Sequence, residues 1–353
     1  MSARLALIFV ILLVVLGGGA LLYQQQERSR RPDNVGTLGQ PLLKDLKASE
    51  IKSIRITEPK SKLTLNLKND TWVIAERDDF PADFAKVRDF VVKAISLKVG
   101  QSEPIGDKDR ARLNLDESGT QVEFMGGDGK PIGKLTVGKK YFKRDVDNPE
   151  KANADGRFVA VPGEPKQAYL VSDALAQAST RTADWIDRQS FQVEKVKTLE
   201  VRHPDGGTWR IERDGDNADW RMAPLRPGEK VEPTKTNAAS YSLSLLELAD
   251  VAPKGSTIEN PIQIEATTLD GLSYSIKVGK AEGENHPVAF SSSGNLTPGG
   301  DSKDADRLKN IEARLPREKV LQQHVLLIPK AKLEDTLKKR EDLLVEKKQD
   351  AKK

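Results

Sequence analysis

The chain has 353 residues, of which 37% are hydrophobic, and this length allows two domains of ordinary size, each with its own core. Its 57 Lys and Arg residues nearly balance its 53 Asp and Glu residues, and a net charge of +4 is too small to indicate a nucleic-acid partner. No cysteine is present, which excludes disulfides, thiolate nucleophiles and cysteine-based zinc sites.

The first element along the chain is an uncharged apolar run from Leu5 to Leu22. A helix of this length rises about 1.5 Å per residue and can cross most of a hydrocarbon core about 30 Å thick. We therefore predict one transmembrane helix within an N-terminal anchor and tether, residues 1–30. The alternatives are a cleaved signal peptide, with Gly18 and Ala20 near its cleavage site, and a buried soluble helix. Basic residues flank both ends of the run, so the flanking charges do not decide its orientation.

The first α+β unit, residues 31–191, begins with an alternation that predicts strands. "IKSIRITEP" and "KLTLNLKN" each place their apolar side chains on one face, and "TWVIAE" is a third short strand. Residues 81–97, "PADFAKVRDFVVKAISL", have helical spacing and a proline at the start. "TQVEFMG", "IGKLTVGKKY" and "RFVAVPG" predict three more strands, and residues 171–186 predict a closing helix.

The same order of elements returns in the second α+β unit, residues 192–329. "VKTLEVRHPDGGTWRIERDG" matches the first strand pair, "DWRMAP" matches "TWVIAE", and residues 233–251 occupy the place of the helix. "IQIEATTLDGLSYSIKVGK" predicts two strands joined by a turn at Asp270 and Gly271. A charged, solvated helical tail follows at residues 330–353. The predicted fold class is therefore α+β: an N-terminal transmembrane helix, then two similar antiparallel sheet-plus-helix units that form a pseudo-repeat.

A tryptophan stands at the same place in both units, where the third strand leads to the helix. These residues are Trp72 and Trp220. We interpret them as buried seam residues, because a large aromatic side chain can cover a sheet edge beneath a helix. The alternative is a ligand-stacking platform, for which the rings would have to be exposed.

No sequence pattern predicts a catalytic, cofactor-binding or metal-binding residue. The three histidines, His203, His286 and His324, do not have the spacing of a metal site. "DVDNPE" (145–150) and "DGDNAD" (214–219) resemble parts of calcium loops but lack the glycine and the distal glutamate. "GKLTVGKK" (133–140) resembles a phosphate-binding loop, but Lys140 replaces the magnesium-binding Ser or Thr and the stretch has the pattern of a strand. We therefore expect no enzyme activity and no cofactor.

The "W-x-[IM]-A" strand end, the "P-A-D" helix start and the later "VGK" strand resemble an uncharacterised bacterial domain-of-unknown-function family. Members are membrane-anchored, and their genes often accompany gliding-motility-type ABC transport components. The resemblance covers about residues 40–330, and the second unit departs from it, with Pro224 after "WRMA" and no "PAD". It implies a body outside the cytoplasm and brings no catalytic residues.

From these features we expect a membrane-anchored, extracytoplasmic and non-enzymatic accessory or scaffold protein of an ABC-type transport or envelope assembly system. It would lie in the cell inner membrane, with the bulk of the chain in the periplasm, and its partner would be a membrane protein such as an ABC transport component. The alternative is a module that binds an envelope saccharide or peptide, and a further alternative is an envelope hydrolase. Burial of Trp72 and Trp220 favours the scaffold, whereas exposed rings in a groove favour the binding module.

Overall fold

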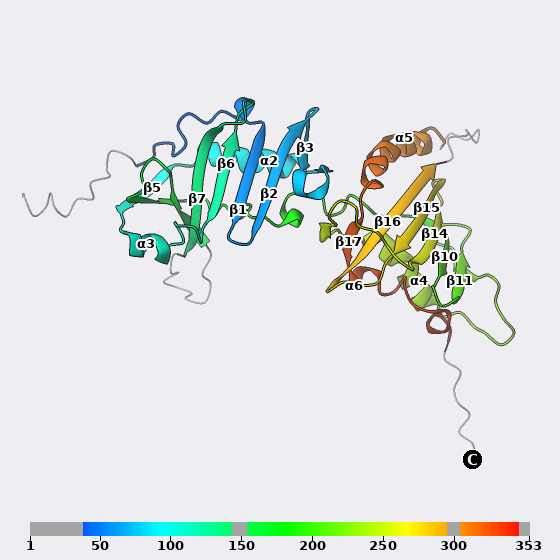
Figure 1. Ribbon diagram of the computed structural model, residues 1–353. Coiled ribbons are helices and arrows are strands. Elements are labelled where there is room, and N and C mark those ends of the chain that lie inside the picture. Colours follow the sequence, from blue (N-terminus) through cyan, green and yellow to red (C-terminus); the bar gives the residue numbers. More distant parts are fainter. Residues whose placement is uncertain (1–37, 143–153, 295–303, 346–353) are drawn as a thin grey trace, which may run out of the picture. The chain divides into compact units, whose positions relative to one another are not determined.

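The computed structural model describes residues 38–142, 154–294 and 304–345, and these residues are dominated by two large antiparallel sheets (Figure 1). The predicted α+β fold class is therefore wrong, because the described chain is mostly β with few helices. None of the described helices is long and apolar enough to cross a membrane. The predicted transmembrane run, Leu5–Leu22, lies outside the described residues.

The first sheet has nine strands in the order β4-β3-β2-β1-β6-β7-β8-β9-β5. Their bounds are β1 Ser53–Glu58, β2 Ser61–Lys68, β3 Thr71–Ile74, β4 Phe80–Pro81, β5 Val99–Pro104, β6 Thr120–Met125, β7 Pro131–Phe142, β8 Ala154–Ala160 and β9 Gln167–Val171. Two helices accompany them, α2 Phe84–Ser96 and α3 Asp107–Arg112, with short 3-10 turns η1 Ala48–Glu50 and η2 Ala75–Arg77.

Helix α2 forms where residues 81–97 predict a helix, and the cause is local. The Asp83 carboxylate accepts a hydrogen bond from the Ala85 N–H at 2.9 Å, which caps a free donor at the helix start. Apolar side chains at helical spacing then turn inward, and Phe90 stacks on Phe124 of β6 with ring centroids 6.1 Å apart. The alternation in the strands supplies the matching apolar face.

The second sheet has eight strands in the order β12-β11-β10-β14-β15-β16-β17-β13. Their bounds are β10 Val196–Arg202, β11 Thr208–Glu212, β12 Arg221–Met222, β13 Asp250–Val251, β14 Ile262–Thr268, β15 Leu272–Val278, β16 Asn285–Gly294 and β17 Leu326–Pro329. The helices are α4 Pro233–Tyr241, α5 Asp304–Leu321 and α6 Lys330–Leu333, with 3-10 turns η3 Thr182–Asp184, η4 Ser242–Leu245 and η5 Arg340–Leu343.

The eight strands of the second sheet follow the same order as eight of the nine strands in the first, with β10 in the place of β1 and β14 in the place of β6. Even the register agrees. Ile54 and Ile56 of β1 face Phe124 and Val122, and Leu199 and Val201 of β10 face Ala266 and Ile264. Among the described residues, the first sheet has β4 and also α3 between β5 and β6 as additions, and the second has α5 between β16 and β17.

Two predicted helices are not formed. In residues 171–186 the end of β9 is followed by turns and by the 3-10 turn η3, and Asp173 accepts a hydrogen bond from the Leu175 N–H, which stabilises a local turn instead of a helix. The predicted charged tail contains only α6 and η5 within its described part. It packs on the second sheet: Leu333 and Leu343 are buried, and Trp209 Nε1 donates to the Lys338 carbonyl at 2.7 Å.

The two compact units of the chain have different boundaries from the two units that the sequence predicts. One compact unit contains Met1–Ser61 and Phe90–Ala178, and the other contains Lys62–Asp89 and Ser179–Lys353. The candidate site described below lies within the second of these units.

Candidate functional site

Trp72 and Trp220 occupy matching positions in the two sheets, and both are buried, with 8% of each side chain exposed. Trp72 lies in β3, opposite Leu67 of β2. Trp220 directly precedes β12, and the Arg213 guanidinium lies over its ring, 4.8 Å from the centroid. The prediction of buried seam residues is confirmed for both rings.

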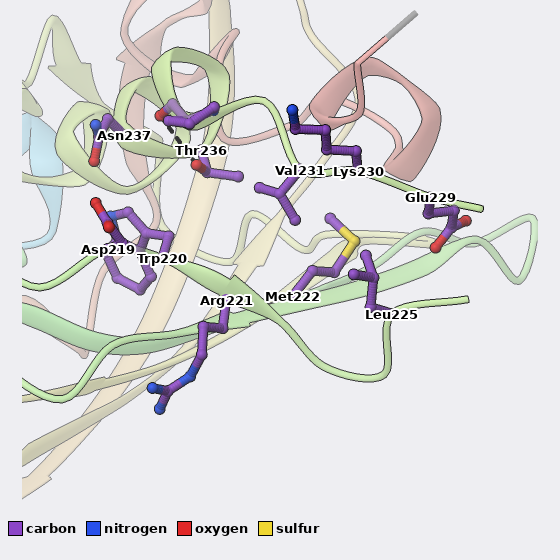
Figure 2. Close-up of a pocket in the computed structure, with 11 residues that line it drawn as sticks. Asp219, Trp220, Arg221, Met222, Leu225, Glu229, Lys230, Val231, Thr236 and Asn237 are labelled. Carbon is purple, nitrogen blue, oxygen red and sulfur yellow. Dashed lines mark hydrogen bonds between the residues drawn. The ribbon is translucent and has the colours of Figure 1, made fainter. Parts of the chain in front are cut away.

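A hollow of about 530 Å³ adjoins Trp220 (Figure 2). Its wall is built by β12, by the connection that follows β12 and by the first turn of α4. Met222, Leu225 and Val231 point toward one another in its centre. The full lining is Asp219, Trp220, Arg221, Met222, Leu225, Glu229, Lys230, Val231, Pro233, Thr236 and Asn237.

A smaller hollow of about 210 Å³ is also lined by Trp220. Trp220 and Asn237 line both hollows. The smaller hollow also contains Lys195, Arg213 and the exposed Tyr241. Arg213 is held there by hydrogen bonds to the carbonyls of Val196 and Asp216, which fixes its guanidinium over the Trp220 ring.

The C-terminal segment pairs with the rim of the larger hollow. The Val345 N–H donates to the Lys230 carbonyl at 2.8 Å, and the Glu232 N–H donates to the Leu343 carbonyl at 3.0 Å. Arg340 donates two hydrogen bonds to the Glu229 carboxylate. These bonds, followed by one from the Arg226 N–H, lower the pKa of Glu229 to about 2. Glu229 is therefore ionised at neutral pH and serves to hold the chain end.

The three histidines that the sequence singles out are not brought together. His203 Nε2 lies 3.3 Å from the Lys338 carbonyl, and His286 Nδ1 lies 2.8 Å from the Gly279 carbonyl. His324 packs edge-on against Phe80 with ring centroids 5.1 Å apart, and burial lowers its pKa. Each ring therefore has a structural contact of its own.

The two loop-like motifs also have structural explanations. Residues 133–140 lie inside strand β7, so their glycines do not form a loop that precedes a helix. Within 214–219, Asp214 binds Arg221 at 2.8 Å and Asp216 binds Arg213 at 2.9 Å. Residues 145–150 lie outside the described residues. In the described part of the chain, no group of three His, Asp or Glu side chains is placed to hold a metal ion.

Residues 72–270 match the family described as Domain of unknown function (DUF4340), and this match covers more than half of the chain. The chain belongs to the DUF4340 family. No curated protein and no solved structure shows significant similarity to it. The DUF4340 segment begins at Trp72 and includes Trp220 and every residue that lines the larger hollow.

Sequence reasoning found Trp220 but missed the apolar side chains that meet beside it in the DUF4340 segment. Met222, Leu225 and Val231 have no shared spacing, and only folding brings them together. One signal was visible: after "WRMA" the second unit lacks the "PAD" that follows "WVIAE" in the first. The structures also differ here, because β4 pairs with β3 in the first sheet and, among the described residues, no strand pairs with the outer edge of β12 in the second.

Proposed function

We propose that this protein is a non-enzymatic accessory or scaffold protein that binds a protein partner. The observation that carries the proposal is the burial of Trp72 and Trp220 at matching places in the two sheets. An aromatic side chain that binds a saccharide or a base by stacking presents an open face, whereas these rings contribute to packing.

The free face of each sheet supports the same proposal. Opposite the apolar face of the first sheet, Arg55, Glu123 and Lys134 form a row of ion pairs at 3.0 and 2.6 Å. On the second sheet, Glu200 is held by Arg202 and Arg210. Cross-strand pairs of opposite charge stabilise a sheet, and polar, solvent-accessible groups of this kind form the rim of protein–protein interfaces.

The proposal is tested by purifying the tagged full-length chain from whole cells, including their gently solubilised membranes, and identifying co-purifying proteins by mass spectrometry. A protein captured in this way is then purified and its binding to the chain is measured directly. We expect a saturable complex with one stoichiometry. If no co-purifying protein binds the purified chain, the accessory function is wrong.

A module that binds an envelope saccharide or peptide is the second candidate, and the observation that favours it is that Trp220 lines two hollows. Peptidoglycan fragments are suitable probes. Binding that is lost on Trp220→Phe but kept on Trp72→Phe would favour this candidate over the scaffold.

An inner-membrane location, a periplasmic body and an ABC-type transport component as the partner stay predictions from the sequence. They do not enter the two arguments above. The proposed partner binding depends on the sheets and their surfaces alone.

A further inference from the structure

The chain covers the outer edge of strand β3 with a strand of its own. Phe80 and Pro81 of β4 pair with Ile74 and Val73 of β3. The Ile74 carbonyl accepts a hydrogen bond from the Asp79 N–H at 3.1 Å, next to this pair. Phe80 is almost completely buried, so one large apolar side chain seals this sheet edge.

Strand β12 has the place of β3 in the second sheet, but in the described part of the chain no strand covers its outer edge. The register confirms the match, since Met222 faces Ile211 as Ile74 faces Leu65. The Ala223 N–H donates to the Arg210 carbonyl at 3.0 Å, toward β11. Because hydrogen-bonded and non-hydrogen-bonded pairs alternate in an antiparallel ladder, the N–H and C=O of Met222 point to the outer edge.

The larger hollow lies where the counterpart of Phe80 would be. In the first sheet Phe80 is the cross-strand neighbour of Ile74, and in the second sheet Met222 takes the place of Ile74 and lines the hollow. Leu225 and Val231 complete its apolar centre (Figure 2). Leu225 is 48% exposed, although it lies beside other apolar side chains.

We propose that the outer edge of β12 binds an extended segment of a protein partner, which adds one antiparallel strand and inserts a large apolar side chain between Met222, Leu225 and Val231. Strand addition of this kind takes its affinity from main-chain hydrogen bonds and its specificity from side-chain pockets. The proposal rests on the proposed partner binding and names the surface that performs it.

The charges at the rim of the larger hollow indicate which features of a bound segment the β12 edge recognises. Arg221 is paired with Asp214, and Glu229 is paired with Arg340. Asp219 and Lys230 contribute one charge of each sign to the lining. The rim has no strong preference for either sign, so the apolar side chain and the extended backbone are the features that the edge recognises.

The chain supplies its own probe, because residues 77–84, "RDDFPADF", contain the strand that covers β3. A synthetic peptide of this sequence, with a photoreactive group at its amino terminus, is titrated against the full chain. We expect saturable binding, cross-links within residues 219–231, and slower hydrogen exchange of the Met222 amide. Replacing the peptide's phenylalanine at the Phe80 position with alanine should weaken binding about 10-fold, as expected for the loss of one buried aromatic side chain.

Two exposed leucines of the second unit provide a matched pair of variants. Leu225→Asp should weaken peptide binding about 10-fold or more, because it places a charge in the apolar centre of the hollow. Leu245→Asp, at a site that is 45% exposed and outside the lining, should leave binding unchanged. Both variants should keep the unfolding temperature of the parent chain, since neither leucine is buried.

Three results would overturn the proposal: no saturable peptide binding, cross-links that map outside residues 219–231, or equal binding by the Leu225→Asp and Leu245→Asp chains. A captured partner that binds the Leu225→Asp chain as tightly as the parent would leave the accessory function standing and remove the β12 edge as its site. Conversely, if no partner is captured, the accessory function fails while the peptide titration still decides what the edge binds.

Discussion

The two sheets share one strand order, yet their edges and faces are covered by different segments. The first closes its β3 edge with Phe80 and Pro81, whereas the second leaves β12 open and is instead covered by α5 and by a docked C-terminal segment. The difference indicates that strand pairing and strand covering are set separately. Which strands pair follows from local alternation and turns. Which parts of a sheet are covered follows from the extra segments that each sheet has between or after its strands.

The free faces of the sheets differ in the same way. Arg55 faces Glu123 in the first sheet, and at the matching positions of the second sheet Glu200 faces Glu265. The carboxylate of Glu200 is compensated by Arg202 and Arg210, and Glu265 accepts a hydrogen bond from Ser275 at 2.7 Å. One register therefore accommodates an ion pair in one copy and two like charges in the other.

The largest expected effect comes from Trp209→Ala, because Trp209 has the place of Leu63 in the first sheet but also holds the chain end through the Lys338 carbonyl. We expect it to lower the free energy of unfolding by about 3–5 kcal/mol and to remove hydrogen-exchange protection from the Leu344 amide. Leu63→Ala should cost less and leave Leu344 protected. Equal losses without any change at Leu344 would contradict the docking role of Trp209.

Arg314→Met tests the cover that α5 provides for the second sheet. Glu318 of α5 is buried and accepts hydrogen bonds from Arg314 Nε at 2.7 Å and from the Tyr274 hydroxyl at 2.8 Å. Burial raises the pKa of Tyr274, so the phenol stays a donor. Removing Arg314 leaves a buried carboxylate with less compensation. The expected loss is roughly 2–3 kcal/mol, below the value for a fully buried pair because Arg314 is 29% exposed.

Urea unfolding followed by hydrogen exchange of α5 amides measures this loss. The double variant Arg314→Met, Glu318→Met should recover most of the stability, since it removes the uncompensated charge as well. If Arg314→Met alone is neutral, the buried cluster does not hold α5 to its sheet.

Acid should release the docked C-terminal segment. The pKa of Glu229 is lowered from its ordinary 4.5 to about 2 by Arg340, so the ionised form is favoured in the folded chain. Its contribution to stability is fully present above pH 4.5 and is lost as the pH falls toward about 2. We expect the hydrogen-exchange protection of the Val345 amide, measured relative to an unstructured peptide at the same pH, to fall over this window.

The matched control for this pH dependence is the neighbouring pair of Lys339 and Asp205, which is more exposed. Arg340→Met should lower the protection of the Val345 amide already at neutral pH and remove the acid dependence of that protection, whereas Lys339→Met should leave both nearly unchanged. Equal behaviour of the two variants would show that the segment is held by other contacts.

The smallest effect concerns the facing carboxylates of the second sheet. Glu265→Lys places an ammonium group opposite Glu200 and so imitates the pair of Arg55 and Glu123. The expected gain is about 0.2–1 kcal/mol, the usual range for a cross-strand pair of opposite charge. Arg55→Glu in the first sheet should produce a loss of similar size. Both appear as shifts in the urea midpoint with an unchanged slope, and a destabilising Glu265→Lys would mean that its bond to Ser275 matters more.

Local features of the fold were predictable from the sequence. Alternation placed β1, β2, β10 and β11, and helical spacing after Pro81 placed α2. The matching positions of Trp72 and Trp220, and their burial, followed from the order of elements around them. The candidate site was predictable only in part, since Trp220 was found and its apolar neighbours were not.

The sequence by itself determined which side chains share one face of a strand or one side of a helix. These faces follow from repeats of two and of about 3.6 residues, which can be read from neighbouring residues along the chain. Only the tertiary structure decided which sheet edges are covered and where the charged tail docks. Those outcomes depend on contacts between residues far apart in the chain. Leu333 and Leu343 are buried because the C-terminal segment packs on the second sheet. Leu225 is exposed beside a hollow at the outer edge of β12, where no counterpart of Phe80 is present among the described residues.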